Sequence, residues 1–190
     1  MKRSPLFSEE LGIALGRRND REYFKWFLAS LLFGARISAT IAVHTYQAFA
    51  RHHLLRPRRI LDAGWDYLVN PIMREGGYVR YDGRKSTQVL RDCQFLLSEY
   101  RGSLSRLHER ATDEEDLEAK LLAFYGVGPV TTNIFLRELR PCWAKADPEP
   151  LPMVLEAARA VGLDMDAFER KSVAFARIEA GLIRLHKEVR

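Results

Sequence analysis

Apolar residues recur at spacings of three and four along most of the chain, which is the period of an amphipathic helix. The pattern predicts a long helical stretch over 23–49, divided near Gly34 to Ser38, where glycine and serine interrupt the apolar run. Further helices are predicted over 58–68, 70–75, 86–100 and 166–189. Alternating strand patterns are almost absent, so the expected fold class is all-α.

The stretch 112–139 predicts two helices joined by a tight turn. Thr112 and Glu115 have the spacing of a capping box, and the helix that they open is predicted to run to about residue 124. The turn Tyr125-Gly-Val-Gly-Pro129 follows, and a proline suits the first position of a second helix. The sequence therefore predicts a helix-hairpin-helix.

The two glycines of the turn decide what the hairpin can hold. Gly126 and Gly128 have no Cβ, so a foreign backbone can approach them closely. The first N–H groups of the second helix carry a partial positive charge, which suits an anion such as phosphate. The same glycines also fit an ordinary helical hairpin, so this pattern alone leaves both interpretations open.

Asp147 is followed by Pro148, which repeats a helix start signal, because aspartate is a favoured N-cap and proline a favoured first residue. Asp147 is therefore expected at the N-terminus of a helix over 151–161. An aspartate before a proline is most often a purely structural cap, and a chemical role needs additional context.

Composition and charge fit a globular protein with a polyanionic partner. The 190 residues are 47% hydrophobic, which is enough for a core in one or two small domains. A net charge of +5 and a pI near 9.4 suit a polyanion without requiring one. Arg84 and Lys85 lie where a glycine-rich segment turns into a helix, which is a natural place for phosphate contacts.

Cysteine and histidine usage narrows the compartment and the cofactors. Two widely spaced cysteines and no apolar signal segment near the N-terminus favour a reducing interior, so a cytoplasmic protein is expected. The uncharged run 26–35 is half the length that crosses a bilayer, so no membrane span is expected. His44, His52 and His53 lack ligand spacing, and no metal site is predicted.

Three segments of the chain resemble one known family. Leu122-Ala-Phe-Tyr-Gly-Val-Gly-Pro-Val-Thr-Thr-Asn-Ile-Phe-Leu136, with Asp147 at the expected distance, is similar to the L-P-G-V-G-x-K-T-A hairpin of the helix-hairpin-helix (HhH-GPD) DNA glycosylase superfamily. Gly76 to Lys85 is similar to the family's G-x-x-x-x-K-A segment, and Trp26 to Arg36 resembles its apolar second helix. The resemblance covers about residues 22–161 and is to the endonuclease III group.

The resemblance implies a fold of two helical lobes. Residues 22–140 would form a six-helix unit that includes the helix-hairpin-helix over 113–140. Residues 1–21 and 141–190 would form the second lobe, and Asp147 would face the cleft between the two lobes. A monomer associated with the bacterial nucleoid is expected.

The resemblance also implies a base-excision activity on double-stranded DNA, in which a damaged or modified base is flipped out and its N-glycosidic bond is hydrolysed. Asp147 would be the catalytic carboxylate, and Trp143 is the aromatic residue expected nearest to the flipped base. Arg36 aligns with the position from which family members fill the gap in the base stack.

The remaining DNA contacts are implied by the same resemblance. They would come from the hairpin and from the segment before the helix over 86–100, and a monovalent cation can accompany the hairpin as in the family. The contact residues would be Gly126, Gly128, Val130, Thr131, Thr132, Arg84 and Lys85.

Two departures from the family define the expected chemistry. Val130 stands at the position of the family's lyase lysine, and valine cannot form a Schiff base, so a monofunctional enzyme is predicted. Cys93 and Cys142 are too few for the four thiolates of an iron–sulfur cluster, so no cluster is predicted.

Three alternatives stay open at this point. A non-catalytic helix-hairpin-helix protein would keep the hairpin and the basic face without needing Asp147. A bifunctional glycosylase/lyase would need another amine, and Lys145 is the lysine nearest in sequence to Asp147. A helical scaffold for protein partners would bind with little dependence on salt.

Overall fold

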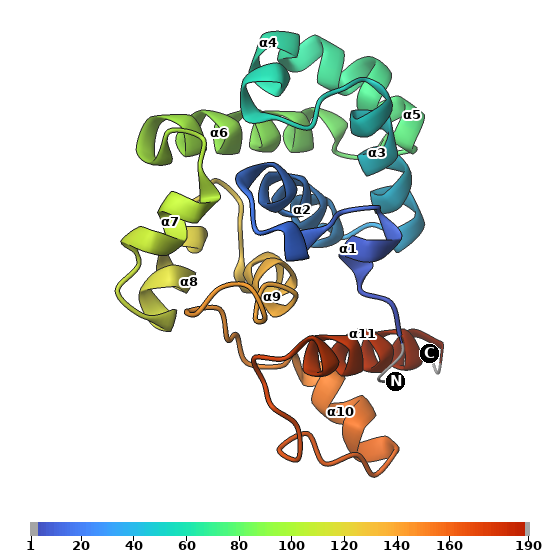
Figure 1. Ribbon diagram of the computed structural model, residues 1–190. Coiled ribbons are helices and arrows are strands. Elements are labelled where there is room, and N and C mark those ends of the chain that lie inside the picture. Colours follow the sequence, from blue (N-terminus) through green and yellow to red (C-terminus); the bar gives the residue numbers. More distant parts are fainter. Residues whose placement is uncertain (1–3, 189–190) are drawn as a thin grey trace.

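The computed structural model describes residues 4–188 of the chain, with side chains for residues 4–186. Throughout this range the chain folds into helices and connecting segments without a strand, which confirms the all-α class. Figure 1 shows α2 (Asp20–Phe33) and α9 (Pro129–Arg137) at the centre of the larger part of the molecule, where they pack against each other.

Most of the other helices surround this central pair. One layer follows α2 in the sequence and passes over one side of it (Figure 1). Its elements are α3 (Ala39–Arg51), α4 (Pro57–Tyr67), the π-type turn η2 (Leu68–Met73), α5 (Arg74–Gly76) and α6 (Asp82–Tyr100).

Shorter helices complete the structure on the remaining sides. They are the N-terminal α1 (Phe7–Glu10) and η1 (Leu15–Arg17), then α7 (Leu104–Arg110) and α8 (Glu114–Leu122), and finally α10 (Pro152–Ala160) and α11 (Val173–Glu188). The last two pack against each other beyond α9 (Figure 1), and Ser4, the first described residue, accepts a hydrogen bond from Arg177 of α11. None of the described helices is both long and apolar enough to span a membrane.

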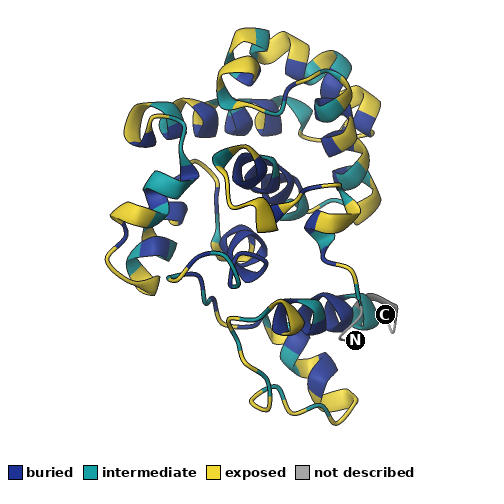
Figure 2. Ribbon diagram, viewed as in Figure 1, coloured by how far each residue is buried: buried dark blue, intermediate teal, exposed yellow. Residues whose placement is uncertain are grey.

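The central helix α2 is buried around almost its whole circumference (Figure 2). The Asn19 side chain caps it by accepting a hydrogen bond from Glu22 N, which satisfies one of the free donors at its start. Trp26 is completely buried, and its Nε1 donates to the carbonyl of Phe135 in α9 over 3.0 Å. A solid apolar core thus fixes α9, the second helix of the hairpin.

Two separate apolar clusters divide the molecule. The larger contains buried residues between Ile13 and Ala146, and the smaller joins α10 to α11. Phe7 packs against both clusters, and its backbone N–H donates to the Glu138 carboxylate at the end of α9. Ile13 and Leu15 belong to the larger cluster, so the N-terminal segment contacts both parts rather than only the C-terminal one.

Several predicted helix boundaries are wrong. Asp113, not Thr112, caps α8 by accepting from Asp116 N. The last helix begins at Val173 rather than at 166, and α6 begins at Asp82 rather than at 86. Helix α7 was not predicted.

The helix expected directly after Asp147 begins only at Pro152, with Leu151 as its N-cap, so Asp147 is not a helix cap. Prolines at 148, 150 and 152 explain the delay, because each disfavours helical backbone in the residue before it. Asp147 therefore lies on an extended segment that connects α9 to α10.

Candidate functional site

The turn between α8 and α9 has the backbone that its glycines predict. Gly126 adopts a φ of +70°, a left-handed conformation that favours glycine, and a Cβ there would lie 3.2 Å from the Gln88 amide nitrogen. Gly128 faces open space, because a Cβ at this position would meet no atom within 4 Å. It precedes Pro129 at the first position of α9, so the N–H groups of Val130 and Thr131 have no acceptor within the helix.

The hairpin turn borders a cationic cavity of about 500 Å³. Its walls come from the loop after α2, the start of α6 with the residues before it, and the turn itself. They are formed by Gly34, Ala35, Arg36, Tyr78, Tyr81, Arg84, Lys85, Gln88 and Gly126.

Arg36 and Arg84 are exposed at this cavity. Within residues 4–186 neither guanidinium forms an ion pair with a carboxylate. Tyr81 is also exposed, and the Arg80 guanidinium lies 5.0 Å from the centre of its ring. The open end of α9 therefore combines free cations, aromatic surface and free N–H groups.

Lys85 lies at the floor of this cavity and is only 8% exposed. Its ammonium donates to the carbonyl of Leu31 over 2.9 Å and to Gln88 Oε1 over 2.6 Å, and burial lowers its pKa to about 8. Burial also raises the pKa of Asp92 to about 8, against the attraction of Lys85. Lys85 thus stabilises the Leu31 carbonyl in the last turn of α2 while it lines the cavity, and its predicted contact with phosphate stays a prediction.

The two threonines that follow Val130 are also placed differently from the prediction. Val130 is 51% exposed, whereas the side chains of Thr131 and Thr132 are buried. Thr131 packs against Gly34, where any Cβ would collide with its hydroxyl. The prediction that the side chains of Thr131 and Thr132 contact DNA is therefore wrong, because their hydroxyls point into the protein.

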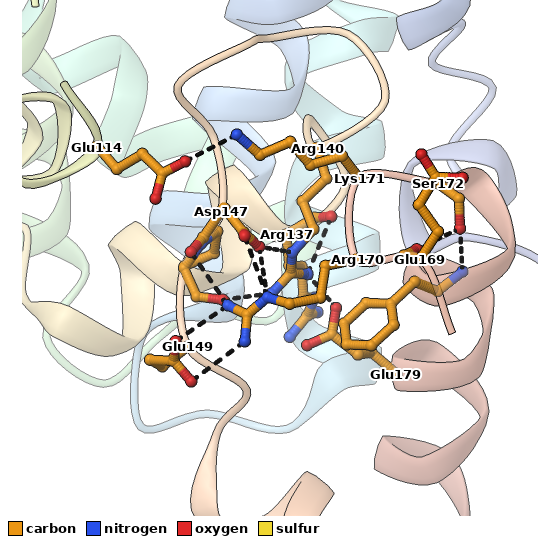
Figure 3. Close-up of polar contacts among 12 residues, drawn as sticks. Glu114, Arg137, Arg140, Asp147, Glu149, Glu169, Arg170, Lys171, Ser172 and Glu179 are labelled. Carbon is orange, nitrogen blue, oxygen red and sulfur yellow. Dashed lines mark hydrogen bonds and ion pairs between the residues drawn. The ribbon is translucent and has the colours of Figure 1, made fainter. Parts of the chain in front are cut away.

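Asp147 lies near the other end of α9, and its carboxylate is held by two arginines (Figure 3). Arg140 Nε lies 3.0 Å from Oδ1, while Arg170 Nε lies 2.9 Å from Oδ1 and 3.1 Å from Oδ2. The Asp147 side chain is 15% exposed. The Asp147 carboxylate thus lies inside an ion-pair network, and the cleft that it was predicted to face stays a prediction.

Arg140 is the fixed partner in this network, with a side chain that is 0% exposed. Besides Asp147 it donates to the Glu179 carboxylate of α11 and to the carbonyl of Pro148. Burial raises the pKa of Glu179, and the nearby Arg140 charge opposes that shift. Arg140 therefore ties together the end of α9, the extended segment and α11.

Trp143 and Lys145 lie just before Asp147, in the turns that follow α9, and contact other parts of the molecule. Trp143 is 2% exposed, stacks on His108 at 4.8 Å between ring centres, and meets Tyr23 edge-on. Its predicted role in a base pocket is corrected, because both ring faces are covered by the core. Lys145 Nζ donates to the carbonyls of His108 over 2.8 Å and Glu109 over 3.4 Å, at α7.

The sequence alone does not identify the partners of Asp147. Arg140 and Arg170 are two of many arginines in the chain, and their spacing from Asp147 corresponds to no helical or strand period. Glu179 gave a usable signal, because it lies on the apolar face of a helix between Phe175 and Leu182. A carboxylate in that position needs a buried cation, and Arg140 supplies it.

No group of three or more His, Cys, Asp or Glu residues in the described part of the chain is arranged to hold a metal ion. Comparison of the chain with protein-family models, with curated proteins and with solved structures found no match.

Proposed function

We propose that this protein binds duplex DNA through the open end of α9 and hydrolyses the N-glycosidic bond of a flipped nucleotide with the help of Asp147. One observation carries the proposal. Gly126 of the glycine turn lines one cavity together with Arg36 and Arg84, which have no carboxylate partner among residues 4–186, and the start of α9 packs against its wall at Gly34. This is the combination that a backbone phosphate requires.

The open surface at Gly128 supports contact with a DNA backbone, which needs a face without side-chain obstruction. Arg36 and Arg84 would then contact neighbouring phosphates, and Arg36 would help to fill the gap in the base stack. We also propose a monovalent cation at the hairpin turn, because main-chain carbonyl oxygens are the donors that such ions take. DNA as the partner stays a proposal.

Asp147 would act on the deoxyribose. As the bond between C1′ and the base nitrogen breaks, positive charge develops on the sugar, and a nearby carboxylate stabilises that charge. Water then adds its oxygen to C1′, and its proton leaves with the base. The products are a free base and an abasic site, and Val130 offers no amine for strand cleavage.

A non-catalytic DNA-binding protein is the second candidate, and one observation favours it. The Asp147 carboxylate is already paired with two guanidiniums, so it can serve the structure alone. This candidate predicts tight duplex binding with no base release from any substrate.

A lyase that uses Lys145 receives less support from the geometry. The Lys145 ammonium is held by two carbonyls at α7, so it would have to leave both of them to attack C1′. We expect no borohydride-trapped adduct with DNA. A trapped adduct that Lys145→Ala abolishes would establish the bifunctional alternative.

The decisive experiment screens base release from duplexes with uracil, alkylated, oxidised and bulky modified bases. On the best substrate, Asp147→Asn is expected to lower release by about 100-fold or more, because the charge is lost while an oxygen acceptor is kept. Glu149→Gln is the matched control, since Glu149 also pairs with Arg170 but is exposed to solvent. We expect it to stay within about threefold of the wild type. Equal activity of Asp147→Asn, with an unchanged melting temperature, would refute the role of Asp147.

A further inference from the structure

The two arginines that hold Asp147 differ in how firmly they are fixed. Arg140 is completely buried and has three further acceptors around it, in Arg137, Pro148 and Glu179. Arg170 is 33% exposed and comes from the irregular segment 161–172 between α10 and α11. Arg140 is therefore fixed by burial, whereas Arg170 is partly exposed to solvent.

Figure 3 shows the Arg170 guanidinium lying against Asp147 and Glu149 of the extended segment. Its guanidinium donates to the carboxylates of Asp147 and Glu149 and to the carbonyls of Asp147 and Pro148, at distances between 2.9 and 3.3 Å. The next residue, Lys171, donates to the Ala144 carbonyl and pairs with Glu114. Two successive cations thus fasten segment 161–172 onto the extended segment.

This arrangement has a chemical consequence for Asp147. A carboxylate that forms a two-oxygen contact with a guanidinium has most of its charge compensated, so it stabilises an external positive charge poorly. Arg140 contacts only Oδ1, and its burial prevents it from leaving. Oδ2 is bound by Arg170, so freeing this oxygen requires Arg170 to move.

A phosphate is a suitable alternative partner for Arg170. Phosphate and carboxylate both accept paired hydrogen bonds from the planar guanidinium, so a phosphate can replace the acceptors that Arg170 leaves. We propose that Arg170 is a displaceable counter-ion, which closes Asp147 in the free protein and moves to a phosphate of the bound DNA strand. Arg140 then holds the freed carboxylate in place. This inference rests on the proposed function.

The test is a double-mutant cycle on duplex affinity, measured as a function of salt concentration with unmodified DNA. Arg170→Ala removes one phosphate contact, so affinity should fall about fivefold and the salt slope should decrease by about one. Asp147→Asn releases Arg170, so affinity should rise about three- to tenfold. In the Arg170→Ala background the same Asp147→Asn change should have no such effect.

Lys171→Ala provides the matched control, because it removes a neighbouring cation that does not contact Asp147. In that background the gain from Asp147→Asn should persist. An equal gain from Asp147→Asn with and without Arg170 would overturn the proposal, since Asp147 would then only repel DNA through its charge. An unchanged affinity and salt slope of Arg170→Ala would also overturn it.

The outcomes separate this inference from the proposed function. Duplex binding without coupling between the two residues rejects the displaceable counter-ion alone, whereas a chain that binds no duplex rejects both. Should Arg170→Ala fail to fold, Arg170→Lys keeps the charge and loses the planar fork. The gain from Asp147→Asn should then be reduced by about half on a logarithmic scale, and a full gain would contradict the proposal.

Discussion

The two ends of α9 carry arginines in opposite circumstances. At the N-terminal end, Arg36 and Arg84 are exposed at a cavity, and no carboxylate of residues 4–186 neutralises them. At the C-terminal end, Arg137 and Arg140 are buried, and Arg140 is paired with Asp147 and Glu179. The same residue type thus provides exposed charge at one end and internal cross-links at the other.

Helix polarity accounts for part of this difference. The N-terminal end of α9 offers unpaired N–H groups, and their partial positive charge adds to that of Arg36 and Arg84, so this end favours an anion. At the C-terminal end the unpaired groups are carbonyls, and Arg140 donates to that of Arg137. Burial accounts for the rest, because a guanidinium inside the protein is tolerated only with acceptors around it.

The largest expected effect concerns the C-terminal end of α9, where the arginines are buried. Arg140→Ala should lower the free energy of unfolding by about 3–5 kcal/mol, because it leaves the buried Glu179 carboxylate without its counter-ion. Arg84→Ala, at the open end, should change it by less than about 0.5 kcal/mol. Denaturant unfolding measures both free energies. Similar losses of stability for the two variants would mean that the arginines at the two ends do not differ in their structural role.

The second prediction concerns how the free energy of unfolding depends on pH through one buried acid, Asp92. Asp92, below the cavity, has a pKa raised to about 8 by burial, so the folded protein binds one proton more than the unfolded chain between about pH 4 and pH 8. Stability from this group is therefore complete below pH 4 and is lost as the pH rises through this window. Between pH 5 and pH 6.5 the loss should be about 2 kcal/mol, since one extra proton on the folded state changes the free energy of unfolding by about 1.4 kcal/mol for each pH unit.

Asp92→Asn should remove this loss, and unfolding at pH 5, 6.5 and 8 measures it. Lys85 affects the free energy of unfolding only above this range, because its pKa is lowered from 10.5 to about 8. The folded state therefore gains stability from Lys85 as the pH rises above 8. Parallel pH profiles of Asp92→Asn and the wild type between pH 5 and 8 would contradict the assignment.

The third prediction tests the open end directly. Gly128→Val should weaken binding to every duplex by about tenfold, because the new side chain blocks the backbone approach. Stability should hardly change, since Gly128 has a φ of −111° and open space around it. Gly126→Val is the contrasting variant, because its φ of +70° makes any side chain strained, and it should lose stability as well. Unchanged affinity of Gly128→Val would remove the hairpin from the DNA interface.

The smallest expected effect belongs to single arginines of the open end. Arg84→Ala and Arg36→Ala should each weaken duplex binding by about 1 kcal/mol and lower the salt slope by about one. Arg58→Ala makes the same charge change on the exposed surface of α4, away from the residues that line the cavity, and should have less effect. Equal effects of all three would indicate a general attraction by net charge.

Local signals in the sequence predicted the helices well. The division of the N-terminal stretch near Gly34 to Ser38 is confirmed, as are two helices on either side of the glycine turn and the proline at the start of α9. Periodicity, glycine and proline act over a few residues, which is why they could be read from the sequence. The N-cap assignment of Asp147 is wrong, although the alternating prolines after it contained the contrary signal.

The surroundings of individual side chains were decided by the tertiary structure. The sequence determined by itself that α9 begins after an open glycine turn, since Gly126 and Gly128 require no distant partner for that geometry. It could not determine that Lys85 and Trp143 are buried, or that Arg140 and Arg170 meet Asp147. Those facts depend on which faces of separate elements come together, and only burial between them turns a surface charge or ring into a structural one.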